Sequence, residues 1–189
     1  MNRIAPIGLH RDLLKQAADM VVPAMLKPLF ENGTRSHGFK SSLGFSFAFA
    51  NVLPEDETNE ETKGLTQESL TLSYVYEGSE VSEDDPMTIQ EWVEKCAVYA
   101  NDKLKVTVRT GVEGRTLHAT RPDLIRGGDI IYVGSVIVDD KYGAGSGGPN
   151  HWDEALTREI LHTYWALCME KYNQGKAETT AEVPYMPYF

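Results

Sequence analysis

The residues best suited to chemistry gather near the start of one predicted helix. Four side chains that can bind a metal or transfer a proton fall close together: His151, Asp153, Glu154 and His162. About three helical turns separate the two histidines, so they cannot bind one ion from this helix alone. Helix capping explains the two carboxylates, and no metal site is predicted. His151 is the candidate catalytic acid or base because imidazole titrates near neutral pH, and Glu154 is its candidate partner.

A glycine-rich run, Gly143–Gly148, lies just before this helix and satisfies the pattern G-x-G-x-x-G. A dinucleotide site needs such glycines directly after a strand, whereas Asp139–Tyr142 intervenes here. The Gly-Lys-Ser/Thr of a P-loop is missing. The run therefore predicts a loop whose exposed amides let a ligand approach the backbone, with a plain flexible turn as the alternative. The ligand-binding candidates in it are Gly145, Ser146, Gly147 and Gly148.

Positive charge concentrates in the segment Arg115–Arg126 of an otherwise acidic chain. His118, Arg121 and Arg126 are candidates for holding the carboxylate of a ligand through charge-assisted hydrogen bonds. The alternative is a loop whose charges only balance the acidic surface. With His151 and the glycine run, these residues predict a site for a small anionic organic molecule, in a binding protein or an enzyme. In an enzyme, the amides of the glycine run would face a developing oxyanion.

Two elements must position these residues. Asn150–Tyr172 has apolar residues at three- and four-residue spacing, which predicts an amphipathic helix with Trp165 on its sheet-facing side and Gly175 as its stop. On this helix, Glu154 is expected to pair with Arg158. The apolar stretches Ile130–Val133 and Val136–Val138 predict a buried strand before the glycines.

The rest of the chain supplies alternating helices and strands. A helix is predicted for Leu9–Phe30, with a kink or a break at Pro23 and Pro28. Thr88 is a candidate cap for a helix whose apolar face includes Trp92 and Cys96. Strands are predicted for three segments, 45–53, 70–76 and 105–110, and a short strand or turn for 115–121.

This order predicts a single α+β domain, residues 1–189, with a mostly antiparallel sheet flanked by helices. Pro54–Lys63 is expected to form a solvated acidic loop. Residues 176–189 are expected to form an extended tail, which ends in the aromatic sequence Pro184–Phe189. Because exposed aromatic side chains are costly, the tail should pack on the body or on a second subunit, which favours a homo-oligomer.

Composition restricts the function classes. The chain has 189 residues and a net charge of -10, which argues against nucleic acid and anionic membranes as partners. Cys96 and Cys168 fall on apolar helical faces, which is typical of buried thiols in a reducing compartment. No stretch has the length and apolarity of a membrane span. We therefore expect a cytoplasmic protein with a small-molecule ligand.

Three segments carry a resemblance to a known family: Gly134–Val138, Gly145–Gly148 and Asp153–Leu156. They are similar to the end of the profilin-like domains named for haem-binding and glycolate-utilisation proteins, also described as haem-degrading. Lys95 lies where the middle helix of many members carries a basic residue. The chain departs from the pattern in its acidic insertion, its aromatic tail and the longer turn at Asp139–Tyr142.

The resemblance implies a profilin-like fold and an oligomer-forming binder of small molecules. It also implies an alternative function, a haem- or tetrapyrrole-binding module without turnover, with His118 or His151 as the axial ligand. A purely structural interaction module is a third reading, since no strong catalytic motif is visible in the sequence.

Overall fold

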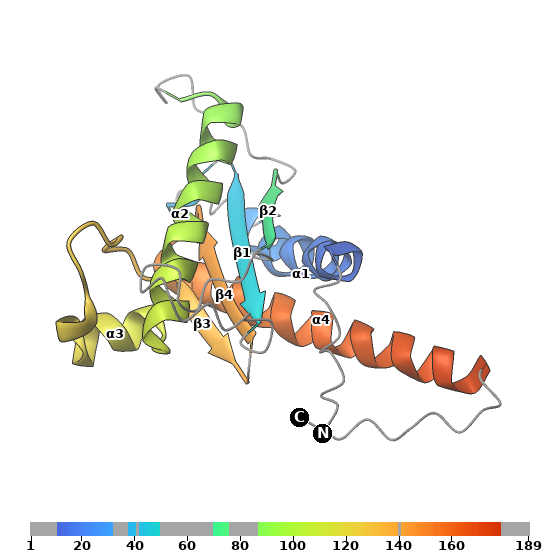
Figure 1. Cartoon of the computed structure of the whole chain (residues 1–189). Helices are drawn as coiled ribbons and strands as arrows, with labels where there is room; N and C mark the ends of the chain where they lie inside the picture. Colours follow the sequence, from blue (N-terminus) through green and yellow to red (C-terminus); the bar gives the residue numbers. More distant parts are fainter. Residues whose placement is uncertain are drawn as a thin grey trace, which may run out of the picture.

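Helices cover both faces of a small sheet (Figure 1). The computed structural model describes residues 11–31, 38–40, 42–49, 70–75, 87–139 and 141–178. In chain order the elements are α1 (Arg11–Glu31), β1 (Leu43–Phe49), β2 (Leu70–Tyr74), α2 (Ile89–Thr110), α3 (Gly114–Thr120), a 3-10 turn (Pro122–Leu124), β3 (Ser135–Val138), β4 (Lys141–Ser146) and α4 (Asn150–Glu178).

The sheet has four strands in the order β2-β1-β4-β3, and every neighbouring pair is antiparallel. Strand β1 lies inside the sheet, where Phe45 is opposite Leu72 of β2 on one side and Gly145 of β4 on the other. The predicted single α+β domain with an antiparallel sheet is confirmed.

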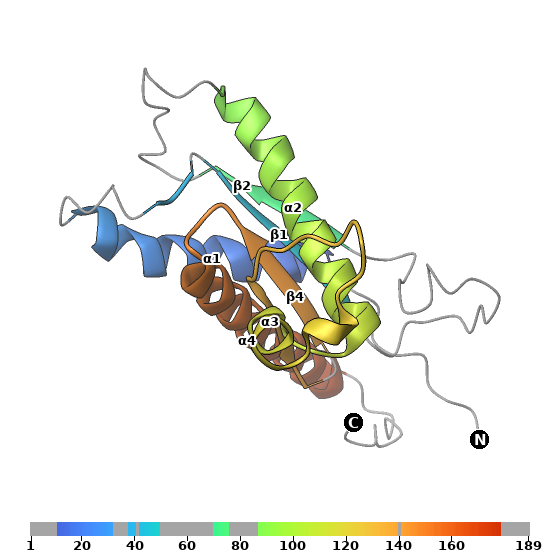
Figure 2. The same cartoon turned by 90° about the vertical axis from the view of Figure 1, so that its left-hand side faces the viewer.

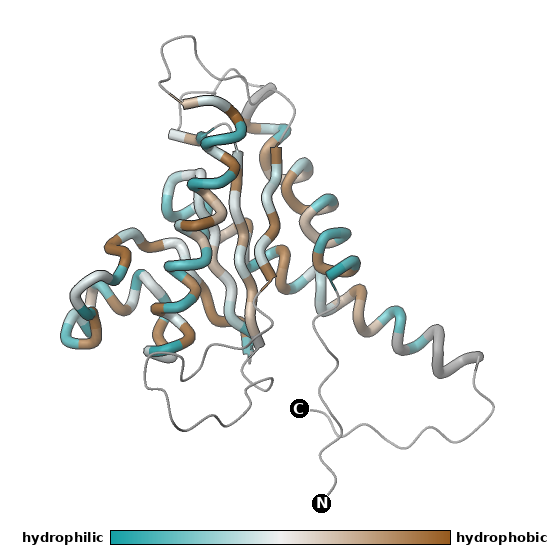
Figure 3. Tube along the Cα trace, turned by 45° about the horizontal axis from the view of Figure 1, so that its top comes forward, coloured by the Kyte–Doolittle hydropathy of each residue, from teal (hydrophilic) through white to brown (hydrophobic). Residues whose placement is uncertain are grey.

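The two faces of the sheet are covered by different helices. Helix α2 packs on one face, whereas α4 packs on the other with α1 against it (Figure 2). The main apolar core lies on the α1/α4 side, where Phe45 and Phe47 of β1 meet Leu14 of α1 and Ile160 of α4. Figure 3 shows hydrophobic positions along the strands and hydrophilic positions on the outer turns of the helices. Tyr164 of α4 is buried, while Trp165 is half-buried with the Lys141 ammonium over its ring.

Helix α2 begins as predicted and ends later than predicted. Thr88 and Glu91 form a capping box, in which the Thr88 hydroxyl accepts from the Glu91 amide and the Glu91 carboxylate accepts from the Thr88 amide. The helix continues to Gly111, which ends it in the left-handed conformation. The predicted strand at residues 105–110 is therefore wrong. Its β-branched residues continue the helix because Val106 and Thr107 are buried in α2.

Other segments also differ from the sequence-based expectation. Residues 115–121 belong mainly to helix α3 and form no strand. Helix α1 is continuous through Pro23 and Pro28, so the predicted break is wrong, and α4 runs through Gly175 to Glu178. Residues 130–133 are irregular, and Ile131 and Tyr132 are exposed.

Some predictions concern parts of the chain that the structure does not describe. The acidic loop at 54–63 and the tail beyond residue 178 lie outside the described residues. Among the helices in the described ranges, none has the length and apolar character needed to cross a membrane.

Candidate functional site

The glycine-rich run is mostly a strand. Its first part, Gly143–Ser146, lies in β4 between β1 and β3, so the predicted loop is wrong there. The Gly145 amide donates to Gly134 O at 2.9 Å, and the Gly148 amide donates to Asp153 Oδ1 at 2.9 Å. These two amides are therefore already bonded within the protein, and Ser146 is buried.

The glycines of β4 let α4 approach the sheet closely. A Cβ on Gly145 would lie 2.8 Å from both the Asp153 carbonyl oxygen and Thr157 Oγ1, which is too close for any larger residue. Gly143 faces α4 in the same way, with Thr157 Cγ2 at 2.5 Å from its ideal Cβ position. The two-residue spacing of these glycines is the period of a strand, and this is the signal that could have identified β4 from the sequence.

A buried ion pair that the sequence analysis missed lies beside these glycines. Lys103 of α2 donates from Nζ to Asp153 Oδ2 at 3.0 Å and to Gly145 O at 2.7 Å. The two side chains are only 3% and 2% exposed. Burial raises the pKa of Asp153 to about 6, although the Lys103 ammonium favours the ionised carboxylate. The available signal was a lysine on the buried stripe of α2, between Ala100 and Thr107.

The two candidate catalytic residues lie on the first turns of α4. His151 is exposed beside Trp152, with 6.2 Å between ring centroids. Arg115 of α3 donates from Nε to Glu154 Oε2 at 3.0 Å and to Oε1 at 3.3 Å, and its Nη2 forms an ion pair with Oε2 at 2.8 Å. The expected Glu154–Arg158 pair is not formed.

Arg158 pairs with Glu113 instead, at 2.8 Å, and both side chains contact the backbone of β3. The Ile137 amide donates to Glu113 Oε1 at 2.9 Å, and the Ile137 carbonyl accepts from Arg158 Nη1 at 3.3 Å. Two arginine–glutamate pairs therefore connect the start of α3 to α4.

The remaining predicted ligand residues lie farther along the chain from Arg115. Arg121 follows α3 and pairs with the exposed Asp123 at 3.0 Å. Arg126 is exposed, and its amide donates to Asp129. Arg109 of α2 fixes this segment by binding the Asp129 carboxylate and the Leu124 carbonyl.

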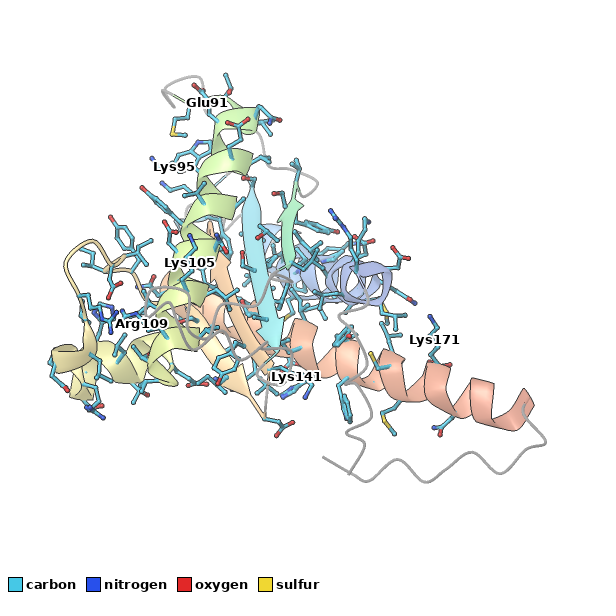
Figure 4. The ribbon with its side chains drawn as sticks, in the orientation of Figure 1. Glu91, Lys95, Lys105, Arg109, Lys141 and Lys171 are labelled. Atoms are coloured by element: carbon cyan, nitrogen blue, oxygen red, sulfur yellow. The ribbon has the colours of Figure 1, made fainter. Side chains whose placement is uncertain are left out.

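His118 is half-buried on α3, the helix that also carries Arg115. His151 and Glu154 lie at the start of α4, and the contact between Arg115 and Glu154 joins the two helices. Lys95, which the resemblance singled out, lies on the outer side of α2 over the rings of Trp92 and Tyr99 (Figure 4). Within the described ranges, no three His, Cys, Asp or Glu side chains are arranged to hold a metal ion.

Comparisons with known proteins assign no function. No family model matches the sequence, and no curated protein matches it. Among solved structures, the chain is similar to the crystal structure of Klebsiella pneumoniae protein ORFY, a DUF336 protein. The TM-score is 0.46 and the identity 15%, over 88% of this chain and 97% of that chain.

Proposed function

We propose that this protein binds a small organic carboxylate where α3 meets the start of α4. One observation carries the proposal: Arg115 already holds a carboxylate, that of Glu154, through hydrogen bonds from Nε to both oxygens and an ion pair of Nη2 with Oε2. Paired N–H groups on a planar guanidinium are the usual means of recognising carboxylates in proteins.

The arginine has capacity for a further anion. Glu154 occupies the edge formed by Nε and Nη2, while the Arg115 side chain remains 61% exposed. No other partner of Arg115 is present among the described residues. A ligand carboxylate can therefore bind the second edge of the guanidinium, or displace Glu154 from the first.

One histidine is a helical neighbour of Arg115, and another is a helical neighbour of its partner Glu154. His118 is three residues from Arg115 on α3, and His151 is three residues from Glu154 on α4, which are the spacings of helical neighbours. In an enzyme, His151 would act as the general base and Glu154 would orient it or the ligand. Arg121 and Arg126 would then contact only a larger anion.

The proposal is tested by titrating the ¹⁵N-labelled chain with acetate or succinate and measuring the amide chemical shifts. Both anions should shift the amides of residues 113–118 and 150–155, and Arg115→Gln should weaken their binding at least tenfold. Lys15→Gln is the matched control, because Lys15 is an exposed cation on α1 paired with Asp19. Unchanged affinity in Arg115→Gln, or no shift in the wild type, would contradict the proposal.

The same preparation tests the haem alternative. Hemin should give no Soret shift that depends on either histidine. A shift abolished by His118→Ala or His151→Ala would replace the carboxylate proposal with a haem-binding module.

The expected cytoplasmic homo-oligomer is part of the proposal. Its support is the aromatic sequence at the C-terminal end, together with the family resemblance. Light scattering should show an oligomer that dissociates when residues 179–189 are removed. A monomer before and after the deletion removes this part of the proposal.

A further inference from the structure

The first turn of α4 is connected to α2 by the buried pair of Lys103 and Asp153. Lys103 comes from the helix on one face of the sheet, and Asp153 from the helix on the other. The Lys103 ammonium donates both to a carboxylate oxygen of Asp153 and to the Gly145 carbonyl of β4. One side chain therefore joins α2, β4 and α4.

The ammonium reaches Asp153 beside a glycine at the end of the sheet. A Cβ on Gly134 would lie 2.7 Å from Lys103 Nζ, 3.0 Å from Gly145 O and 3.1 Å from Asp153 Cβ. Gly134 also has a φ of +132°, a conformation that side chains other than glycine rarely adopt. The space for this contact therefore depends on the residue that precedes β3.

Asp153 uses its second oxygen on the turn that leads into α4. Oδ1 accepts from the Gly148 amide at 2.9 Å, while the Asp153 amide donates to Pro149 O at 3.0 Å. The side chain and the backbone amide of Asp153 thus both bond to the turn that precedes α4. His151 and Glu154 lie on either side of Asp153 in that helix.

We infer that Lys103 and Asp153 are positioning residues, which fix the start of α4 and thereby place His151 and Glu154 at the proposed site. A buried ion pair adds little net stability compared with apolar residues of the same size, but it restricts geometry. The inference rests on the proposed function only for its effect on ligand binding.

The main test replaces both charges at once, as Lys103→Met with Asp153→Leu. This double variant avoids an unpaired buried charge and should fold. It removes the acceptor of the Gly148 amide, so hydrogen exchange at Gly148 should accelerate at least tenfold while exchange at Leu161 is unchanged. Acetate binding should weaken about tenfold in the same variant.

The matched control is an exposed ion pair on α2, the helix that carries Lys103. Lys105 and Asp102 are 3.1 Å apart with side chains 48% and 42% exposed, so Asp102→Asn should alter neither readout. Unchanged Gly148 exchange in the double variant overturns the inference. Faster exchange with unchanged acetate affinity also overturns it, because the pair would then hold the turn without placing the site. If the wild type binds no acetate, the proposed function fails, while the exchange measurement still decides whether the pair fixes the turn.

If the double variant does not fold, a wild-type measurement tests whether Asp153 holds the turn, which the inference requires. The charged and titratable groups near Asp153 are Lys103 and Cys96 of α2 and Glu154 of α4. The Gly148 amide proton should shift with the same midpoint as the Asp153 carboxyl carbon, near pH 6, because the two groups share a hydrogen bond. A Gly148 signal that does not respond at that midpoint overturns the inference.

Discussion

Strand β1 presents opposite kinds of residue to the two faces of the sheet within its seven positions. Leu43, Phe45 and Phe47 point into the apolar core between the sheet and helices α1 and α4. The alternating residues Gly44 and Ala48 lie on the α2 side. One strand therefore presents large residues to one layer and small ones to the other.

Along β1, the residues that fill the apolar core and the residues that allow a helix to approach closely lie on opposite faces of the sheet. On the α1/α4 face, the large side chains of β1 belong to the larger of the two buried apolar clusters in the described residues. On the α2 face, the helix backbone contacts the strand directly, since a Cβ on Gly44 would lie 2.4 Å from the Cys96 carbonyl oxygen. Polar pairs are also buried there, including Thr107 with Ser135 at 2.6 Å. This close approach brings α2 near enough for Lys103 to reach α4.

The largest expected effect is on the apolar face. Phe47→Ala should lower the free energy of unfolding by about 3–5 kcal/mol, because it leaves a cavity in the main core. Urea unfolding followed by circular dichroism measures the change. Met20→Ala is the control, since Met20 is 53% exposed on α1 and its loss should cost under about 0.5 kcal/mol. Equal effects of the two substitutions would contradict the assignment of the core.

A methyl group added to each face tests the close approach. Gly44→Ala should cost about 2–3 kcal/mol, because the new Cβ meets the backbone of α2, which cannot move alone. Gly143→Ala should cost about 1 kcal/mol less, since the atoms nearest to its new Cβ belong to the side chains of Thr157 and Leu161 and not to backbone. Gly127→Ala is the control because no atom lies within 4 Å of its Cβ position. A larger cost at Gly143 than at Gly44 would reverse the comparison.

The pair that joins the two helices predicts a pH dependence. The pKa of Asp153 is raised from 3.8 to about 6, so the folded chain takes up this proton more readily than the unfolded chain. Its contribution therefore favours folding as pH falls from about 6 towards 4 and is lost as pH rises through 6. The size is on the order of 1–3 kcal/mol. Urea unfolding at pH 4.5 and 7 should show this difference in the wild type but not in the Lys103→Met, Asp153→Leu variant, and identical profiles would contradict it.

The smallest effect concerns a polar pair on the α2 face. Thr107→Val should cost about 1 kcal/mol, because Ser135 loses the hydroxyl donor from α2 but still accepts from the Gly114 amide at 3.1 Å. Thr120→Val is the control, as its hydroxyl is exposed at the end of α3. A Thr107→Val cost as large as that of Phe47→Ala would show that both faces contribute alike to stability.

Sequence patterns predicted the parts of the fold that local chemistry decides. The candidate cap Thr88 predicted the start of α2, and the strand predicted at residues 45–53 overlaps β1. Patterns failed where packing decides. Residues 105–110 alternate like a strand, yet they continue α2 because a capped helix packs along the sheet. The glycines of β4 resemble a loop in sequence, whereas their function is to admit α4.

The candidate site was predicted in part. His151 and Glu154 lie at the start of α4 as expected, because the helix itself was visible in the sequence. The partners of Glu154 and Asp153 were not found, since Arg115 and Lys103 are 39 and 50 residues away along the chain. No local spacing rule connects residues so far apart, and only the tertiary fold brings them together.

The bonds of Glu113 and Arg158 to Ile137 have a consequence for self-association. Strand β3 is an edge strand of the sheet. An exposed edge strand can pair with a strand of another molecule, which leads to aggregation. Here a carboxylate and a guanidinium occupy the outward amide and carbonyl of Ile137, as a neighbouring strand would. We expect Glu113→Ala with Arg158→Ala to promote concentration-dependent association by light scattering. The two charged side chains thus prevent another strand from pairing with β3 at Ile137.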